Sequence, residues 1–179
     1  LIRAPYAAQT NLDDPTALKT TFTYDANGNS DLITDPLGHI VDQDFDEFSR
    51  RVRLASDVGG GGINSVIQTD YDANNRIRRV TDPKQLLTDY GYDSLGNRSG
   101  LSSPDTGVQV FNSDSAGNRT GITDARSIVS NRSYDALNRL TSITFPTPSE
   151  DIQFAWDQAS TKCPTQERYG IGRLSGFID

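Results

Sequence analysis

The stretch YDANGNSDLITDP, residues 24–36, contains two turn signals separated by a short run of strand-forming residues. Related stretches follow it: FDEFSRRVRLASD from Phe45, YDANNRIRRVTDP from Tyr71, YDSLGNRSGLSSP from Tyr92, SDSAGNRTGITDA from Ser113, YDALNRLTSITFP from Tyr134 and a degenerate WDQAST from Trp156. Five of the six steps between their first residues are 21 or 22 residues long. A regular period of this length is the signature of a tandem repeat array.

Each copy begins with an aromatic residue, except that Ser113 takes this place once, and Asp always comes second. In the first six copies, Asn or Arg stands four residues after that Asp. We assign a structural role in the repeat to the first two positions and to the turn glycines, namely Tyr24, Asp25, Gly28, Phe45, Asp46, Tyr71, Asp72, Tyr92, Asp93, Gly96, Asp114, Gly117, Tyr134, Asp135, Trp156 and Asp157.

The motif predicts a β-hairpin in every repeat. Asp at the start of a four-residue turn accepts local backbone hydrogen bonds, and Gly or Asn at its end tolerates positive φ. A second turn opens at Asp82-Pro83, and Asp35-Pro36-Leu37-Gly38 fits a type I turn. Two strands of about six or seven residues and two such turns fill a repeat of about 21 residues. Seven copies therefore predict roughly 14 antiparallel strands.

The composition agrees with an all-β fold. Asp, Asn, Ser, Thr and Gly are abundant, and these residues favour turns over helix interiors. Only 34% of the residues are hydrophobic, and the mean hydropathy is -0.57. A tightly packed sandwich needs more apolar residues on its inner faces. We therefore expect a curled or spiral ribbon-like sheet of tandem antiparallel hairpins with both faces partly wet.

The chain divides into three predicted parts. Residues 1–23 form an N-terminal flanking strand or partial repeat, residues 24–155 hold the repeats, and residues 156–179 form a degenerate, truncated final repeat. The one irregular step contains Gly59–Gly62, which is typical of a flexible insertion. The sequence has no Met, so we expect a piece of a longer protein.

The net charge and the distribution of apolar residues limit the classes of partner that the chain can bind. A net charge of -7 and a pI near 4.6 argue against nucleic acid, because phosphate binding needs concentrated positive charge. No run approaches the roughly 20 apolar residues of a membrane helix, and the first ten residues do not resemble a signal peptide. A single cysteine, Cys163, excludes an internal disulfide framework.

The pattern YDxxGN or YDxxNR, a strand, TDP and a return strand resembles the RHS or YD-repeat family. The resemblance covers residues 24 to about 145 well, and Gly172-Arg173-Leu174 repeats the G-R-L of the motif. It implies a segment of a hollow β-shell, as in bacterial polymorphic toxins, insecticidal toxin complexes and teneurins. It also implies a secreted or cell-surface protein whose shell encloses an effector or projects another domain. No catalytic residue carries over, because the family's Asp-Pro-x-Gly-rich autoproteolytic block is not found after the repeats.

Several residues invite chemical interpretations. Asp42, Asp44 and Asp46 alternate and would share one face of a strand, so calcium is a candidate ligand, although a solvated strand face is favoured. His39 has no second His or Cys partner in the sequence and fits a turn-flanking polar residue. Cys163 lies in no catalytic signature, and Gly59–Gly62 lacks the Lys-Ser/Thr of a phosphate loop. We therefore expect no cofactor and no metal, and we do not expect an enzyme.

Two functions stay open at this point. The leading hypothesis is a non-catalytic structural segment of an RHS-type shell. The alternative is a carbohydrate-binding or adhesive β-surface, in which exposed rings stack on sugars; its candidate residues are Tyr71, Tyr92, Tyr134 and Trp156. The predicted partners are the rest of the parent polypeptide, an encapsulated effector, glycans, or a second copy that pairs edge to edge.

Overall fold

The computed structural model describes residues 18–59, 62–157 and 171–179. Within these ranges the regular elements are fourteen β-strands and a single 3₁₀ turn, η1 (Pro148–Glu150). This confirms the all-β prediction. Cys163, Gly60, Gly61 and residues 1–17 of the predicted flanking segment lie outside the described residues.

The described residues fall into two compact units. The first is drawn from the chain up to Tyr71 together with Val80–Gln85, and the second from Asp72–Arg79 and the chain from Leu86 onward. The first unit contains β1 (Thr21–Tyr24), β2 (Ser30–Thr34), β3 (Ile40–Phe45), β4 (Arg51–Ser56) and β5 (Ser65–Tyr71). The strand β6 (Ile77–Thr81) contributes residues to both units. The second unit contains β7 (Leu87–Tyr92), β8 (Arg98–Ser103), β9 (Gly107–Ser113), β10 (Arg119–Thr123), β11 (Val129–Tyr134), β12 (Leu140–Thr144), β13 (Ile152–Trp156) and β14 (Leu174–Ile178).

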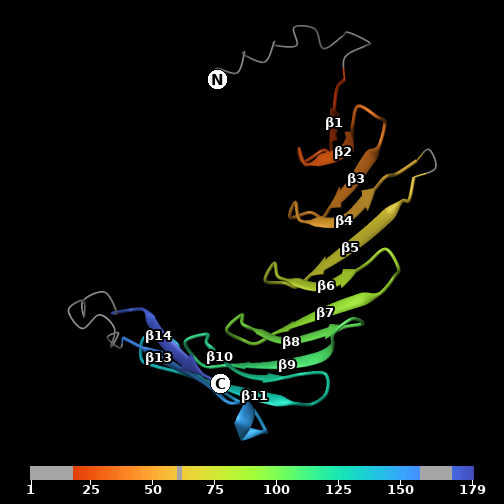
Figure 1. Ribbon diagram of the computed structural model, residues 1–179. Coiled ribbons are helices and arrows are strands. Elements are labelled where there is room, and N and C mark those ends of the chain that lie inside the picture. Colours follow the sequence, from red (N-terminus) through yellow and green to blue (C-terminus); the bar gives the residue numbers. More distant parts are fainter. Residues whose placement is uncertain (1–17, 60–61, 158–170) are drawn as a thin grey trace. The chain divides into compact units, whose positions relative to one another are not determined.

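Within each unit the strands lie side by side in the order of the chain. The order is β1-β2-β3-β4-β5 in the first unit and β7 through β14 in the second, as the ribbon shows (Figure 1). The pairs with a printed register are all antiparallel, for example β3 with β4 and β8 with β9. Within each unit the contacts between strands are made chiefly by strands that follow one another in the chain. The predicted array of tandem antiparallel hairpins is therefore confirmed, and its stability depends on contacts between neighbouring repeats.

The two turns of a repeat share one backbone geometry. In the first turn the Gly28 N–H donates to the Asp25 carbonyl (3.1 Å), and the Asp25 N–H donates to the Asn29 carbonyl (2.9 Å). The second turn repeats these bonds between Asp35 and Gly38 (3.0 Å) and between Asp35 and His39 (3.0 Å). Gly28 and Gly38 have φ of +85° and +88°, as a type I turn with a left-handed residue after it requires. Non-glycine residues take this place elsewhere, namely Ser49, Asn75, Gln85, Ser127 and Asn138.

A β-bulge follows the first turn of the repeats. Tyr92 pairs with Arg98, but Gly91 pairs with Gly100, so Ser99 is one extra residue on the exit strand. The same kind of register shift occurs between β1 and β2, β3 and β4, β9 and β10, β11 and β12, and β13 and β14. Bulges bend the strand locally and increase its twist. In these six hairpins the irregularity therefore recurs at the same place.

Few of the described side chains are buried, since the strands of each unit form a single layer. On β9, Phe111 is only 7% exposed, whereas Val108 and Val110 on the opposite face are 61% and 47% exposed. Phe111 pairs with Ile122 on β10, which in turn pairs with Ser130 on β11, so one face carries a ladder of shielded side chains. In the first unit Ala55 on β4 is fully buried. This explains how a chain of low hydrophobicity folds.

Among the residues that the structure describes, there is no helix with the length and hydrophobicity needed to span a lipid bilayer.

Candidate functional site

The motif Asp closes its own turn through both carboxylate oxygens. Asp135 Oδ1 accepts the backbone N–H groups of Leu137 (2.9 Å) and Arg139 (3.0 Å), and its Oδ2 accepts Arg139 Nε (2.7 Å). Where Asn replaces Arg, the amide plays the same part, as Asn118 Nδ2 does toward Asp114 Oδ2 (3.0 Å). Short polar side chains that bond to their own backbone favour turns over other structures. The Asp therefore fixes the turn, which explains its presence in each copy.

These contacts lower the pKa of the turn carboxylates. At Asp25, Asp46, Asp93 and Asp114 the largest cause is the hydrogen bond from the side chain four residues later. At Asp72 and Asp135 the backbone N–H of that residue is the largest cause of the lower pKa. Hydrogen bonds to the charged form favour ionisation. All these carboxylates are tuned in the same direction and occupy equivalent places, unlike a catalytic acid–base pair, whose members must differ.

In four of the repeats the aromatic residue joins its repeat to the one before it. The Tyr92 hydroxyl donates to the Ile77 carbonyl at 2.9 Å, and Ile77 lies five residues after the preceding motif Asp. The same bond, to the residue at that place in the preceding repeat, is made by the hydroxyls of Tyr71 (to Arg51, 3.1 Å) and Tyr134 (to Arg119, 2.9 Å), and by Trp156 Nε1 (to Leu140, 2.8 Å). We call this contact the repeat junction.

Arginine strengthens three of these repeat junctions. The guanidinium carbons of Arg50, Arg76 and Arg139 lie 4.7, 4.3 and 5.0 Å from the ring centroids of Tyr71, Tyr92 and Trp156 in the next repeat. Each arginine also pairs with its own turn Asp. One side chain thus contacts both its own turn and the next aromatic ring. A cation over an aromatic ring contributes about 0.5–1 kcal/mol at an exposed site.

The junction at Ser113 lacks these contacts. Ser113 has no ring, and the preceding repeat carries Asn97 at the place where three other repeats carry Arg. A different contact stands nearby, where the Arg119 guanidinium carbon lies 4.1 Å from the centroid of the shielded Phe111 ring. The structure therefore contains strong and weak junctions of the same design.

Installing the missing contacts at Ser113 should stabilise the chain. We expect the double variant Asn97→Arg with Ser113→Tyr to unfold with a free energy about 1 kcal/mol higher than the natural chain, because it adds a cation–π contact and a hydrogen bond. Each single variant should give less than half of this gain. Urea unfolding of all four proteins measures the coupling. If the change in the free energy of unfolding of the double variant equals the sum of the changes of the two single variants, the proposed junction contact is contradicted.

The last repeat closes its turn across a long stretch of sequence. The Asp157 N–H donates to the Arg173 carbonyl (3.1 Å), and Asp157 Oδ1 accepts the Gly172 N–H (2.6 Å). Gly172 has φ of +78°, and Trp156 pairs with Leu174. Gly172, Arg173 and Leu174 thus take the places that Asn138, Arg139 and Leu140 hold in the repeat before. This is the structural counterpart of the G-R-L similarity in the sequence.

His39 belongs to a second turn. Its Nδ1 lies 2.8 Å from Asp35 Oδ2, and the imidazole is 58% exposed. The hydrogen bond with the Asp35 carboxylate raises the pKa of His39 above 6.5. A raised pKa means that the stabilisation by this pair is complete below 6.5 and is lost as the pH rises through the value in the folded protein. The pairing places His39 four residues after a turn Asp, the place where the first turns of the repeats have Asn or Arg.

A proton NMR titration tests the His39 pair, since the chain has one histidine and the assignment is unambiguous. We expect the natural chain to titrate above 6.5 and the Asp35→Asn variant to titrate at a lower pH, because the amide carries no charge. Asp124→Asn, which alters a different second turn, is the matched control and should leave the His39 midpoint unchanged. The pairing is contradicted if Asp35→Asn and the natural chain share one midpoint.

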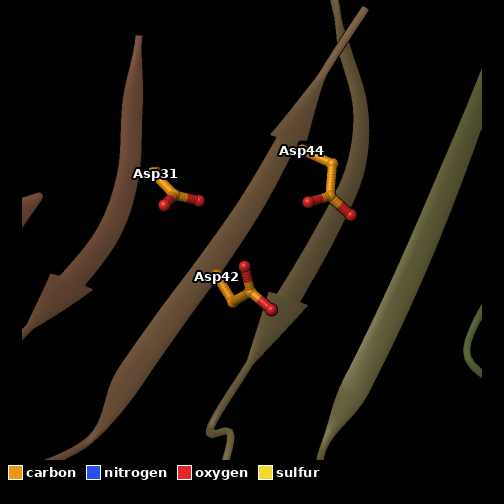
Figure 2. A group of neighbouring side chains, drawn as sticks. All are labelled: Asp31, Asp42 and Asp44. Atoms are coloured by element: carbon orange, nitrogen blue, oxygen red, sulfur yellow. The ribbon is translucent and has the colours of Figure 1, made fainter. Parts of the chain in front are cut away.

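The acidic residues that lie together in the structure differ from the three predicted from the sequence. Asp42 and Asp44 lie on β3, but β3 ends at Phe45 and Asp46 lies in the following turn, where it accepts Arg50 Nε at 2.7 Å. The prediction that Asp46 shares a strand face with Asp42 and Asp44 is therefore wrong. Asp31 on β2 takes its place, and the ligand atoms of Asp31, Asp42 and Asp44 lie within 4.8 Å of one another (Figure 2).

Arg53 on β4 occupies this acidic group. Its Nη1 lies 2.8 Å from Asp42 Oδ2 and 3.1 Å from Asp44 Oδ2, so one cation already bridges the two carboxylates of β3. An arginine in this position supplies the positive charge that a calcium ion would supply. The geometry favours an ion-paired strand face, and calcium binding stays an untested prediction.

The rings proposed to stack on sugars are engaged in junctions. An arginine lies over one face of Tyr71, Tyr92 and Trp156, and the polar atom of each of the four candidate rings, Tyr134 included, donates to a backbone carbonyl. Sugar stacking needs an open ring face. Carbohydrate binding at these residues stays a prediction, and the contacts observed serve the array. Sequence reasoning found the motif positions but missed the junction, although a motif Arg followed by an aromatic residue at the start of the next repeat was a usable signal.

Fold and junctions together define a protein built from tandem β-hairpin repeats. The family model described as RHS Repeat matches residues 71–108 and 114–149. The chain therefore carries RHS repeats in these two stretches, which confirms the resemblance predicted from the sequence. No curated protein sequence matches the chain.

Solved structures with the same fold come from Tc toxins. The chain is similar to the crystal structure of TcdB2-TccC3-Cdc42, with a TM-score of 0.59 and 17% identity over 91% of this chain and 10% of that chain. It is also similar to the Photorhabdus luminescens Tc holotoxin pore with a mutation in TccC3, with a TM-score of 0.59 and 16% identity over 89% of this chain and 10% of that one. At these identities the likeness shows the fold. The chain spans about a tenth of the length of the solved chains. Together these observations support a structural segment of the RHS type.

Proposed function

We propose that this chain is a non-catalytic segment of an RHS-type shell in a secreted or cell-surface protein. Its hairpins form part of a wall that encloses cargo, such as an effector carried by the same parent polypeptide, or projects another domain. The chemistry of the motif is used for construction: backbone ladders join the strands, Asp closes the turns, and aromatic residues join the repeats.

The repeat junction is the observation that carries this proposal. A wall must keep neighbouring hairpins together along its length, and four of the aromatic residues donate to a carbonyl of the preceding repeat. An enzyme or a binding module concentrates its special residues at one place. Here the motif Asp and the aromatic residues recur with the period of the repeat, as expected for an array that forms an extended wall.

Enclosure is tested by limited proteolysis of the full-length polypeptide that contains this chain, with fragments identified by mass spectrometry. We expect a segment outside the repeats to resist cleavage, and to be cleaved about tenfold faster when Tyr92→Ser and Trp156→Ser weaken two junctions. Leu137→Ser, which replaces an exposed side chain in a turn outside the junctions, is the matched control and should leave the protection intact. Equal cleavage of that segment in the natural protein and the junction variant would overturn enclosure.

A glycan array separates this proposal from the adhesive alternative. We expect no saturable binding of sugars by the natural chain, because the candidate rings are committed to junctions. The result that would contradict the wall is saturable sugar binding that is lost in Trp156→Ala. A control variant of equal stability that keeps all the rings should retain this binding. Such a result would favour a carbohydrate-binding surface.

A further inference from the structure

We propose that the hairpin of β7 and β8 carries a binding site for a small aromatic acid, that is, a ligand with a planar ring and one carboxylate. The site is a cavity of about 380 Å³ lined by Arg76, Ile77, Tyr90, Tyr92 and Arg98. All five residues belong to the second compact unit, and none lies on the first or last strand of the array. This binding function is separate from cargo enclosure.

Two tyrosine rings and two arginines form the walls of this cavity. Tyr90 and Tyr92 lie two residues apart on β7, so both rings project from the same face of the strand. The guanidinium carbon of Arg98 on β8 lies 5.1 Å from the centroid of the Tyr90 ring, and that of Arg76 lies 4.3 Å from the centroid of the Tyr92 ring. The side chain of Ile77 completes the lining. The cavity is therefore mainly apolar, with positive charge beside each ring.

Two hydrogen-bonding groups of the lining are uncommitted. The Arg98 guanidinium forms no ion pair, and the Tyr90 hydroxyl forms no hydrogen bond, with any residue that the structure describes. Arg76, by contrast, pairs with Asp72 in its own turn. A guanidinium that packs on a ring keeps its N–H groups free at its edge, and these groups match the two oxygens of a carboxylate. Arg98 and Tyr90 are therefore the groups that bind the anionic end of the ligand.

The lining favours a ligand that combines negative charge with a ring. Arginine side chains only donate hydrogen bonds, and no Asp or Glu is among the five lining residues, although the chain carries a net charge of -7. The tyrosine rings offer surfaces for offset or edge-to-face packing against an aromatic body. A cavity of roughly 150 Å³ is enough for benzene, so this larger one has room for a ring with a carboxylate attached.

Only one repeat has this combination of residues. The place of Tyr90, two residues before the first motif position, is taken in the other copies by Phe22, Gln43, Thr69, Phe111, Arg132 and Phe154. In the next repeat Arg119 lies over the ring of Phe111, but Ser113 supplies no second ring. Residues that build the wall recur with its period, whereas a binding site concentrates its residues at one place. The cavity is therefore an addition to the wall and not a part of its construction.

An NMR titration of the isotope-labelled whole chain with cinnamate tests the site. We expect saturable shifts of the Tyr90 and Tyr92 amide signals, with a Kd of about 1–10 mM for a ligand of this size. Arg98→Gln should weaken binding about tenfold, because it removes the charged partner of the carboxylate. Arg119→Gln, which removes an arginine from the same place in the next repeat, is the matched control and should bind like the natural chain. Circular dichroism shows whether the variants fold.

The neutral analogue cinnamamide separates the effect of charge from that of the ring. It should bind the natural chain about tenfold more weakly than cinnamate and should bind Arg98→Gln equally weakly. Tyr90→Leu, which keeps an apolar side chain without the ring and hydroxyl, should weaken both ligands about threefold. The proposal is overturned if cinnamate does not bind saturably. Equal binding of the acid and the amide by the natural chain, or undiminished binding of cinnamate by Arg98→Gln, overturns it as well.

Discussion

Replacing Trp156 by Ala should lower the free energy of unfolding of the second unit by about 2–4 kcal/mol. Removal of a large aromatic side chain from a fully packed core costs about 3–5 kcal/mol, and Trp156 is half-buried. The indole also donates to the Leu140 carbonyl at 2.8 Å and lies under Arg139, so both partners lose a contact. Urea unfolding followed by circular dichroism measures the change. Hydrogen exchange shows whether β12 and β13 are the strands that open.

Two further variants separate the parts of this effect. Trp156→Phe keeps a ring under the arginine but loses the N–H donor, so it should cost about 1 kcal/mol. Tyr24→Ala removes the same motif position from an exposed site and should change stability by less than about 0.5 kcal/mol in dilute solution. If Tyr24→Ala and Trp156→Ala destabilise the chain equally, the aromatic residue acts within its own repeat and the junction is contradicted.

Acid should destabilise the array, beginning near the ordinary aspartate pKa of 3.8. The turn aspartates have a lower pKa in the folded chain than this value because of hydrogen bonds from the side chain or backbone four residues later. A depressed pKa contributes stability that is complete above the unfolded value and is lost as the pH falls through the folded value. The thermal midpoint should therefore hold between about pH 7 and 5 and fall below pH 4.

The control for acid unfolding replaces three turn carboxylates by amides. A chain with Asp93→Asn, Asp114→Asn and Asp135→Asn keeps an Oδ1 acceptor for the turn N–H groups but has no charge to lose. We expect it to be less stable than the natural chain at pH 7 and to lose less stability between pH 4 and 2.5. General charge repulsion in acid acts on both proteins. If both lose stability equally with falling pH, the turn aspartates are not responsible for the acid unfolding.

The repeats could be predicted from the sequence because each local signal agrees with the next. Asp at the start of the turn, Gly28 or Asn75 at positive φ and Pro36 in the second turn all favour the same hairpin. A period of 21 or 22 residues then fixes the number of strands. Ser49 and Gln85 at positive φ could not be foreseen, since these residue types rarely adopt that conformation and are held there by the surrounding turn bonds.

The candidate site was harder to predict because its contacts cross between repeats. The position of Arg76 is visible in the sequence, but its contact with Tyr92 depends on the pairing of strands and on the bulge that re-aims the side chains. The alternation of Asp42, Asp44 and Asp46 failed for a related reason. A strand face continues only as far as the strand, and Asp46 lies in the turn that ends it.

The turn of the last repeat suggests where such an array accepts inserted residues. Asp157 closes onto Gly172 and Arg173 with residues 158–171 between them, while other repeats place only two residues in that span. The bonds that shape the hairpin are thus made by its two ends, whatever the length of chain between them. Natural or engineered insertions at this point, such as an epitope or a protease site, would leave the neighbouring strands in register. The tip of the first turn is therefore the place where the repeat tolerates inserted residues with the smallest loss of stability.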